Sequence, residues 1–122
     1  MIAVLSGTDR ETIGVRIDGR LTEEDYETLK EEIDLRASQT EEPVSLVVEI
    51  KQLEGMSVQA FLEDLSMIGY ADKLDKMAAI SDDDEWELAA KTIGKPIGAL
   101  MGLDVKHFEP EAKDAAWSWA KA

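Results

Sequence analysis

The spacing of apolar positions along the chain predicts five strands. Residues 12–18 alternate between apolar and polar side chains, which indicates a strand with one buried face. Residues 44–50 are almost continuously apolar, as expected for a strand that is covered on both faces. A turn signal at residues 6–9 separates the first two strands, so we expect them to form an antiparallel hairpin. The three remaining strands are short apolar runs at residues 2–5, 77–80 and 105–108.

A first helix is predicted from Thr22 to about residue 38. Thr22 stands at the N-cap with Asp25 three residues on, close to the pattern of a capping box. Acidic residues in the first turn suit the positive end of the helix dipole. Helical spacing predicts that the buried stripe of this helix consists of Tyr26, Leu29, Ile33 and Ala37.

Three further helices are predicted between the later strands and after the last one. The second helix begins at Ser57 and carries an apolar stripe that includes Phe61 and Leu65. The third helix carries Trp86, and the last one begins at Pro110. The residues expected to be buried along the last helix are Ala112, Ala115, Ala116 and Trp119.

The resulting element order is β-β-α-β-α-β-α-β-α. Strands that alternate with helices imply right-handed crossovers and a mostly parallel central sheet, here after an N-terminal antiparallel hairpin. No linker, repeat or low-complexity segment interrupts the pattern, and 122 residues suffice for one packed core. The sequence therefore predicts a single α/β domain over residues 1–122.

Charge and composition narrow the classes of function. The chain carries 27 Asp and Glu against 13 Lys and Arg, a formal net charge of −14, which disfavours nucleic acid and anionic lipid surfaces. A basic protein partner fits this charge, and so does a purely solubilising role. Without cysteine there is no disulfide, thiolate catalysis or Cys-ligated metal. We also expect no signal peptide and no membrane-spanning segment, and hence a cytoplasmic protein.

Residues that carry a family resemblance are spread over nearly the whole chain. They are Asp18-Gly19-Arg20-Leu21-Thr22, Asp25-Tyr26, Leu46-Val47-Val48-Glu49-Ile50, Leu53-Glu54-Gly55, Ala79-Ile80, Trp86, Phe108 and Ala116-Trp117-Ser118-Trp119. Together with the element order, they resemble the SpoIIAA-like family. Its fold is shared by STAS domains and is close to that of the lipid-binding CRAL-TRIO (SEC14-like) domains. The resemblance implies a STAS/SpoIIAA-like α/β fold and a binding or regulatory role rather than catalysis.

The sequence departs from that family at its phosphorylation site. Bacillus-type STAS antagonists of anti-sigma factors carry a phosphorylatable serine within Asp-Ser-Ser-Gly, where the loop after the third strand meets the second helix. The same place here reads Leu53-Glu54-Gly55-Met56-Ser57-Val58. Only Ser57 could serve as a phosphoacceptor. As an N-cap, the same hydroxyl would stabilise the helix by about 1 kcal/mol without any modification.

Two further polar features have both a chemical and a structural interpretation. The acidic run Asp82 to Glu85 could bind a hard cation, but as the first turn of a helix it complements the dipole without an ion. His107 is the single histidine of the chain and alternates with Val105 in the last strand. No partner for a catalytic relay is evident from spacing, which favours a packed or edge histidine. We therefore predict no catalytic residue, no metal site and no cofactor.

The segment 97–103 is apolar and flanked by glycines. The overlapping stretch Gly94-Lys95-Pro96-Ile97-Gly98 is not a phosphate loop, because Gly-x-x-x-x-Gly-Lys-Ser/Thr is missing and Pro96 removes an amide that such a loop would need. The segment could pack as one turn of helix, cover a cleft as a flap, or form a homodimer patch. Its residues Ile97, Leu100 and Met101 are accordingly candidate contacts for a ligand or partner.

Trp117 and Trp119 cannot share one face of a helix, since residues two apart diverge by about 200°. We expect Trp117 to be partly exposed, available to a partner or lying at a rim.

The leading hypothesis is a non-catalytic STAS-like protein-interaction or regulatory module that binds a protein partner or a second copy of itself. The alternative is a carrier or sensor of a small apolar or lipid-like ligand in a CRAL-TRIO-like cleft. The candidate ligand or partner residues are Phe61, Leu65, Trp86, Ile97, Leu100, Met101 and Trp117.

Overall fold

The computed structural model describes residues 2–5, 11–41, 43–55, 74–82 and 104–122. In chain order, its elements are β1 (Ile2–Val4), β2 (Thr12–Arg20), α1 (Glu23–Ser38), β3 (Val44–Glu54), β4 (Leu74–Ile80), β5 (Asp104–Phe108), the 3-10 turn η2 (Pro110–Ala112) and α5 (Lys113–Lys121). The helices predicted around residues 57–69 and 86–93 lie outside the described residues. No described helix is long and apolar enough to cross a membrane.

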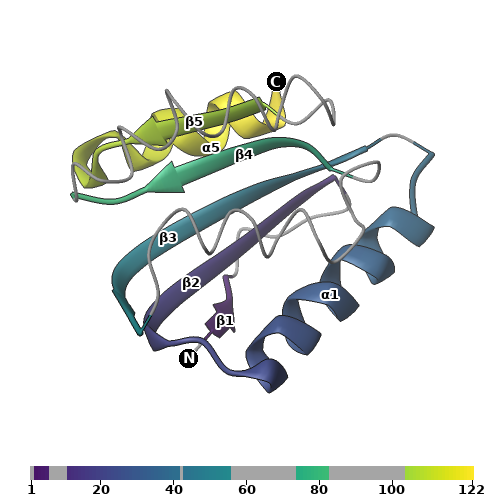
Figure 1. Cartoon of the computed structure of the whole chain (residues 1–122). Helices are drawn as coiled ribbons and strands as arrows, with labels where there is room; N and C mark the ends of the chain where they lie inside the picture. The colour runs from purple at the N-terminus through teal and green to yellow at the C-terminus, as the bar shows by residue number, and fades with distance from the viewer. Residues whose placement is uncertain (1, 6–10, 42, 56–73, 83–103) are drawn as a thin grey trace.

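The five strands form one mixed sheet in the order β1-β2-β3-β4-β5 (Figure 1). β1 pairs antiparallel with β2, so that Ile2 faces Ile17 and Val4 faces Val15. The other three pairings are parallel. The predicted N-terminal antiparallel hairpin followed by a parallel sheet is therefore confirmed.

β3 is the most deeply buried strand, because it lies at the centre of the sheet. All residues from Val44 to Ile50 are buried, as the continuous apolar run predicted. The strand continues to Glu54, beyond the apolar run. Its pairing with β2 shifts by one residue after Ile50, since Ile17 faces Ile50 and Asp18 faces Gln52. Lys51 is the extra residue of this bulge.

The capping box predicted at the start of α1 is present. The Thr22 hydroxyl accepts a hydrogen bond from the Asp25 backbone N–H at 3.2 Å, and the Asp25 carboxylate accepts one from the Thr22 N–H at 2.9 Å. The other carboxylate oxygen accepts a bond from the Ile2 N–H at 3.3 Å, which links α1 to β1. Burial acts to raise the pKa of Asp25, but these bonds outweigh it and lower the pKa.

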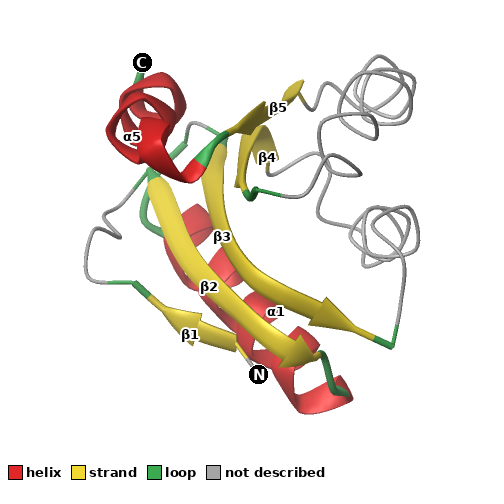
Figure 2. Ribbon diagram, turned by 90° about the vertical axis from the view of Figure 1, so that its left-hand side faces the viewer, coloured by secondary structure: helices red, strands yellow, loops and turns green. Residues whose placement is uncertain are grey.

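The sheet separates two apolar clusters, with α1 on one face and α5 on the other (Figure 2). On the α1 face, Leu29 and Ile33 are fully buried against the sheet, and Tyr26 is partly buried there. The sheet residues of this cluster include Ile13, Val15, Ile17, Leu46, Val48, Met77 and Ala79. The second cluster is smaller and combines Val47, Ala78 and Ile80 of the sheet with Ala116 and Ala120 of α5.

The helix α5 is anchored by its two tryptophans, both of which are half-buried. Trp117 lies over Gly14 of β2, so closely that a β-carbon at Gly14 would be 2.3 Å from its ring. Trp119 packs against Phe108, with ring centroids 5.8 Å apart. The prediction that Ala115 is buried was wrong. It is exposed, because α5 turns the positions of Ala116 and Ala120, four residues apart, toward the sheet.

Candidate functional site

Glu49 is a carboxylate inside the apolar part of the central strand β3. Alternation along the strand places it on the same face as Val47, which packs under α5. It is only 7% exposed. A carboxylate in such a position requires compensating charges or hydrogen bonds, because an uncompensated buried charge is strongly unfavourable.

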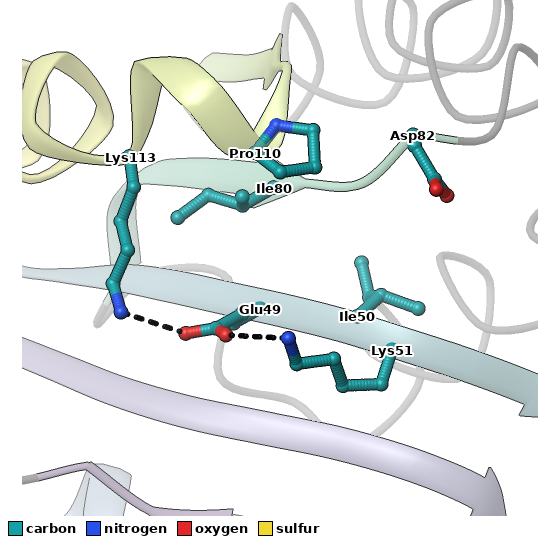
Figure 3. A pocket seen from close by; sticks show the side chains of 7 residues that line it. All are labelled: Glu49, Ile50, Lys51, Ile80, Asp82, Pro110 and Lys113. Carbon is teal, nitrogen blue, oxygen red and sulfur yellow. Dashed lines mark ion pairs between the residues drawn. The ribbon is translucent and has the colours of Figure 1, made fainter.

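Three cations from three elements surround this carboxylate. Arg16 is the register partner of Glu49 on β2, and its Nη2 donates a hydrogen bond to Oε1 at 3.3 Å. Lys51, at the bulge of β3, places Nζ 3.6 Å from the same oxygen. Lys113, the first residue of α5, places Nζ 3.4 Å from Oε2 (Figure 3). The bulge and the start of α5 thus bring both lysines to one buried acid.

The cations keep Glu49 ionised. Burial acts to raise the pKa of this carboxyl, but the positive charges of Lys113, Arg16 and Lys51 outweigh burial, and the pKa lies below its ordinary value. At neutral pH the side chain is therefore a carboxylate. It can accept hydrogen bonds but cannot act as a proton donor.

The two oxygens of Glu49 differ in their hydrogen bonding. Oε1 accepts the bond from Arg16, whereas the buried Oε2 accepts no hydrogen bond from any residue in the described part of the chain. The Lys113 ammonium lies 3.4 Å from this oxygen and forms an ion pair with it. A buried carboxylate oxygen that is held by an ion pair and by no well-formed hydrogen bond is uncommon in folded proteins.

The carboxylate lines a pocket of about 380 Å³, within the range of small-molecule sites. Its lining residues are Glu49, Ile50, Lys51, Ile80, Asp82, Pro110 and Lys113 (Figure 3). Ile80 ends β4, and Pro110 lies two residues after the end of β5, so the pocket lies beside the carboxyl ends of these parallel strands. That edge is where open α/β sheets usually bind their ligands.

The described residues around the pocket carry a different balance of charge from the chain as a whole. Its charged lining consists of two lysines and two carboxylates, and Arg16 adds a third cation behind Glu49. Among these described residues, positive charges exceed negative charges by one, in contrast with the net charge of −14 for the chain. The Lys51 and Lys113 side chains are 58% and 48% exposed, so both can still reach a ligand.

His107 joins β5 to the end of β4, next to the pocket residue Asp82. Its Nε2 lies 2.7 Å from the Ser81 carbonyl oxygen. Because a carbonyl only accepts, Nε2 carries the hydrogen in this contact. The Ser81 N–H in turn donates to the Phe108 carbonyl at 3.1 Å. These two bonds fasten the end of β4 to β5 directly before Asp82, so His107 is a packed histidine in a structural contact.

A second group of charged and aromatic side chains secures α5. Lys76 Nζ donates to the Trp119 and Ala122 carbonyls at 3.1 and 3.0 Å, which satisfies acceptors at the end of the helix. Lys106 Nζ lies 5.2 Å from the Phe108 ring centroid and 5.9 Å from that of Trp119. The Lys76 bonds hold the helix to β4, and the contact of Lys106 with Trp119 holds it to β5.

Most residues predicted from the sequence as candidate contacts lie outside the described residues. These are Ser57, Phe61, Leu65, Trp86, Ile97, Leu100 and Met101. Of the acidic run, only Asp82 is described, and it lines the pocket. Trp117 is half-buried, with Lys121 Nζ 5.5 Å from its ring, and its contact with a partner stays a prediction. The described residues contain no group of three or more His, Asp or Glu placed to hold a metal ion.

Sequence reasoning did not single out Glu49, Lys51 or Lys113. One signal was available, because Glu49 interrupts a run of apolar residues that was expected to be covered on both faces. A charge in such a run must be paired. The identity of its partners could not be read from the sequence, since Arg16 and Lys113 are distant along the chain.

Comparisons with known proteins agree on the fold. The sequence model of the SpoIIAA-like family matches residues 12–121. A crystal structure of an uncharacterised DUF3478-family protein from Shewanella loihica PV-4, described as having a SpoIIAA-like fold, is similar with a TM-score of 0.69 and 22% sequence identity. The similarity covers 98% of this chain and 93% of that one. No curated protein matches the chain.

Proposed function

The chain belongs to the SpoIIAA-like family, and on that premise we propose that it is a non-catalytic, regulatory binding module whose binding centre is the Glu49 pocket. The observation that carries this proposal is the buried Glu49 carboxylate, ringed by Arg16, Lys51 and Lys113 at the carboxyl edge of the sheet. The pocket recognises a small polar ligand, and its occupancy is the signal that the module passes on.

The state of Glu49 supports binding over general acid catalysis. A general acid works best when its pKa lies near the operating pH. Here the surrounding cations move the pKa of Glu49 in the opposite direction, below its ordinary value. The carboxylate therefore stays charged and fixed between its partners, as suits a group that recognises a ligand.

The lining of the pocket favours a polar ligand over an apolar one. Four of its seven described lining residues are charged. Placing an apolar ligand there would remove water from these groups without replacing their hydrogen bonds, which is unfavourable. A lipid-like ligand bound by Phe61, Leu65, Trp86, Leu100 and Met101 involves residues outside the described part of the chain, and no contact described here favours it.

Amide chemical shifts of ¹⁵N-labelled protein, screened against a library of small polar and apolar compounds, test the proposal. We expect polar compounds to shift the resonances of Ile50, Lys51, Ile80 and Asp82 together. The Lys51→Gln variant, at an exposed lining position, should weaken this response. Lys30→Gln, at an exposed position on α1, is the matched control and should not. A library without any compound that perturbs these residues would contradict the proposal.

A further inference from the structure

We infer, on the basis of the proposed function, that the ligand of the Glu49 pocket carries a carboxylate at one end, an ammonium group at the other and a short apolar chain between them. Its carboxylate lies against the ammonium groups of Lys51 and Lys113, and its ammonium group lies against the carboxylate of Asp82. An ω-amino acid is a simple compound of this class. Three features of the pocket carry the assignment: its cationic end, its acidic end and the apolar surface between them.

The cationic end of the pocket is formed by Lys51 of β3 and Lys113 of α5. Glu49 holds both ammonium groups there, at 3.6 Å from Oε1 and 3.4 Å from Oε2 (Figure 3). The lysine side chains are 58% and 48% exposed, so a ligand can touch them directly and need not reach the buried carboxylate. Each ammonium group has three N–H donors, and its contact with Glu49 involves one carboxylate oxygen. The remaining donors of the two lysines suit the carboxylate of a ligand.

The acidic end of the pocket is marked by Asp82, which is exposed. Ile80 is the register partner of Glu49, and Asp82 follows it by two residues, which correspond to roughly 7 Å along a strand. Figure 3 shows the Asp82 carboxylate at the other end of the pocket from the lysine ammonium groups, both of which are directed toward Glu49. Among the described lining residues, Asp82 is therefore the carboxylate that lies apart from the lysines. An ammonium group of a ligand complements its charge and donates hydrogen bonds to it.

The described surface between the two ends is apolar. It consists of the side chains of Ile50, Ile80 and Pro110, which lie between the lysines and Asp82 (Figure 3). Methylene groups of a ligand can pack against these side chains without removing water from a charged group. The order of the lining, from cationic through apolar to acidic, matches a molecule whose charged groups are separated by methylene groups. An α-amino acid does not match it, because its two charged groups are too close together to reach both ends.

Four probes test the inference: 5-aminovalerate, valerate, butylamine and norvaline. Valerate and butylamine each replace one charged group of 5-aminovalerate by a hydrogen. Norvaline is an isomer of 5-aminovalerate that carries its ammonium group on the carbon next to the carboxylate. The dissociation constants are measured from amide chemical shifts of the ¹⁵N-labelled full chain at neutral pH and constant ionic strength.

We expect 5-aminovalerate to bind most tightly of the four. Butylamine should bind about tenfold or more weakly, because it loses the charged hydrogen bonds to both lysines. Valerate should bind about two- to fivefold more weakly than 5-aminovalerate, since Asp82 is exposed and an exposed ion pair contributes little. Norvaline should resemble valerate, because its ammonium group does not reach Asp82.

Two variants assign the ends of the ligand. Asp82→Asn should reduce the affinity for 5-aminovalerate to that for valerate and leave valerate binding nearly unchanged. Lys51→Gln should weaken 5-aminovalerate and valerate by similar factors and leave butylamine binding unchanged. Both positions are exposed, so we expect both variants to fold, which the dispersion of the amide spectrum checks. Asp75→Asn, at an exposed position at the start of β4, and Lys30→Gln on α1 are the matched controls and should change no dissociation constant.

The outcomes distinguish the inference from the proposed function. If valerate or norvaline binds as tightly as 5-aminovalerate, the assignment of two separated charged groups is overturned and the pocket remains a binding site. An Asp82→Asn variant that keeps the preference for 5-aminovalerate over valerate overturns it as well. The assignment also fails if none of the four probes perturbs the resonances of the pocket while another compound of the library does. If no compound perturbs them, the proposed function fails with it.

Discussion

The two faces of the sheet are built on different principles. The described core on the α1 face is made of apolar side chains, with Leu29 and Ile33 fully buried against the sheet. The face under α5 combines a small apolar cluster around Val47 and Ala116 with the buried charge of Glu49. Both faces use the same strands, because alternate residues of each strand point to opposite sides. One face contributes stability by burial, and the other holds charges in a fixed arrangement.

The contrast between the α1 face and the α5 face indicates where a binding site can arise in this fold. A binding site needs polar groups that are held in place. A fold tolerates their burial only where apolar burial elsewhere provides enough stability. β2 illustrates the division, since Ile13 and Val15 face α1 while Gly14 and Arg16 face the side of α5. The same strand therefore supports the core and the charged ring.

The largest effect is expected on the α1 face. Replacing the fully buried Ile33 by alanine leaves a cavity and should lower the free energy of unfolding by about 2–5 kcal/mol. Leu35→Ala is the matched control, because Leu35 is on the same helix and 47% exposed. It should change stability by about 0.5 kcal/mol or less. Urea denaturation of both variants measures the difference, and equal losses would contradict the described packing of α1.

The second effect concerns the contact between β2 and α5. A β-carbon at Gly14 would lie 2.3 and 2.7 Å from two atoms of the Trp117 ring, so Gly14→Ala should destabilise the fold by about 1–3 kcal/mol. The same substitution in a Trp117→Leu background should be much less damaging, because the ring that it meets is gone. Additive losses in this double-mutant cycle would show that Trp117 does not lie over Gly14 in solution.

A smaller effect is expected at the start of α1. Thr22→Ala removes the N-cap hydroxyl and should lower the free energy of unfolding by about 1 kcal/mol. Thr28→Ala is the control, because the Thr28 hydroxyl bonds an exposed carbonyl within the helix. That variant should be nearly neutral, since alanine has the higher helix propensity. Thermal unfolding monitored by circular dichroism compares the two, and a greater loss for Thr28→Ala would oppose the capping assignment.

The smallest effect is the dependence of stability on pH through Glu49. Its pKa is lower in the folded state than in the unfolded chain. Its contribution is therefore present above the unfolded pKa and is lost as the pH falls through the folded pKa. Glu49→Gln should accordingly flatten the acid side of the stability curve. Asp25, whose pKa is also lowered, contributes in the same direction, so Asp25→Asn measures the part that belongs to α1. A Glu49→Gln curve parallel to that of the wild type would contradict the ion-pair ring.

The fold could be predicted because periodicity and burial agree over most of the described chain. The strand of residues 12–18, the capping box at Thr22 and the buried run of residues 44–50 all follow from local patterns that the tertiary structure respects. The ends of strands were less predictable. β3 extends to Glu54 because its polar residues still pair with β2, with Arg20 facing Glu54. Exposed pairing of this kind leaves no apolar signal.

The candidate site could be predicted only in part. A charge within an apolar strand is visible in the sequence, and it predicts that Glu49 needs a partner. The partners themselves depend on the register between β2 and β3, the bulge at Lys51 and the position at which α5 begins. Each of these is decided by the packing of the whole sheet. The site matches no catalytic or phosphate-binding motif, so its residues could not be recognised from local sequence.

The pKa of the Glu49 carboxyl is the most direct test of the claim that the α5 face holds a pre-arranged charged binding centre. It is measured by following the side-chain carboxyl carbon of Glu49 in NMR spectra as the pH is lowered, in the wild type and in Lys113→Gln. The arrangement predicts a pKa below the ordinary value of about 4.3 for a glutamate, and a higher value when Lys113 is replaced. A pKa at or above the ordinary value that is unaffected by the loss of Lys113 would contradict the claim.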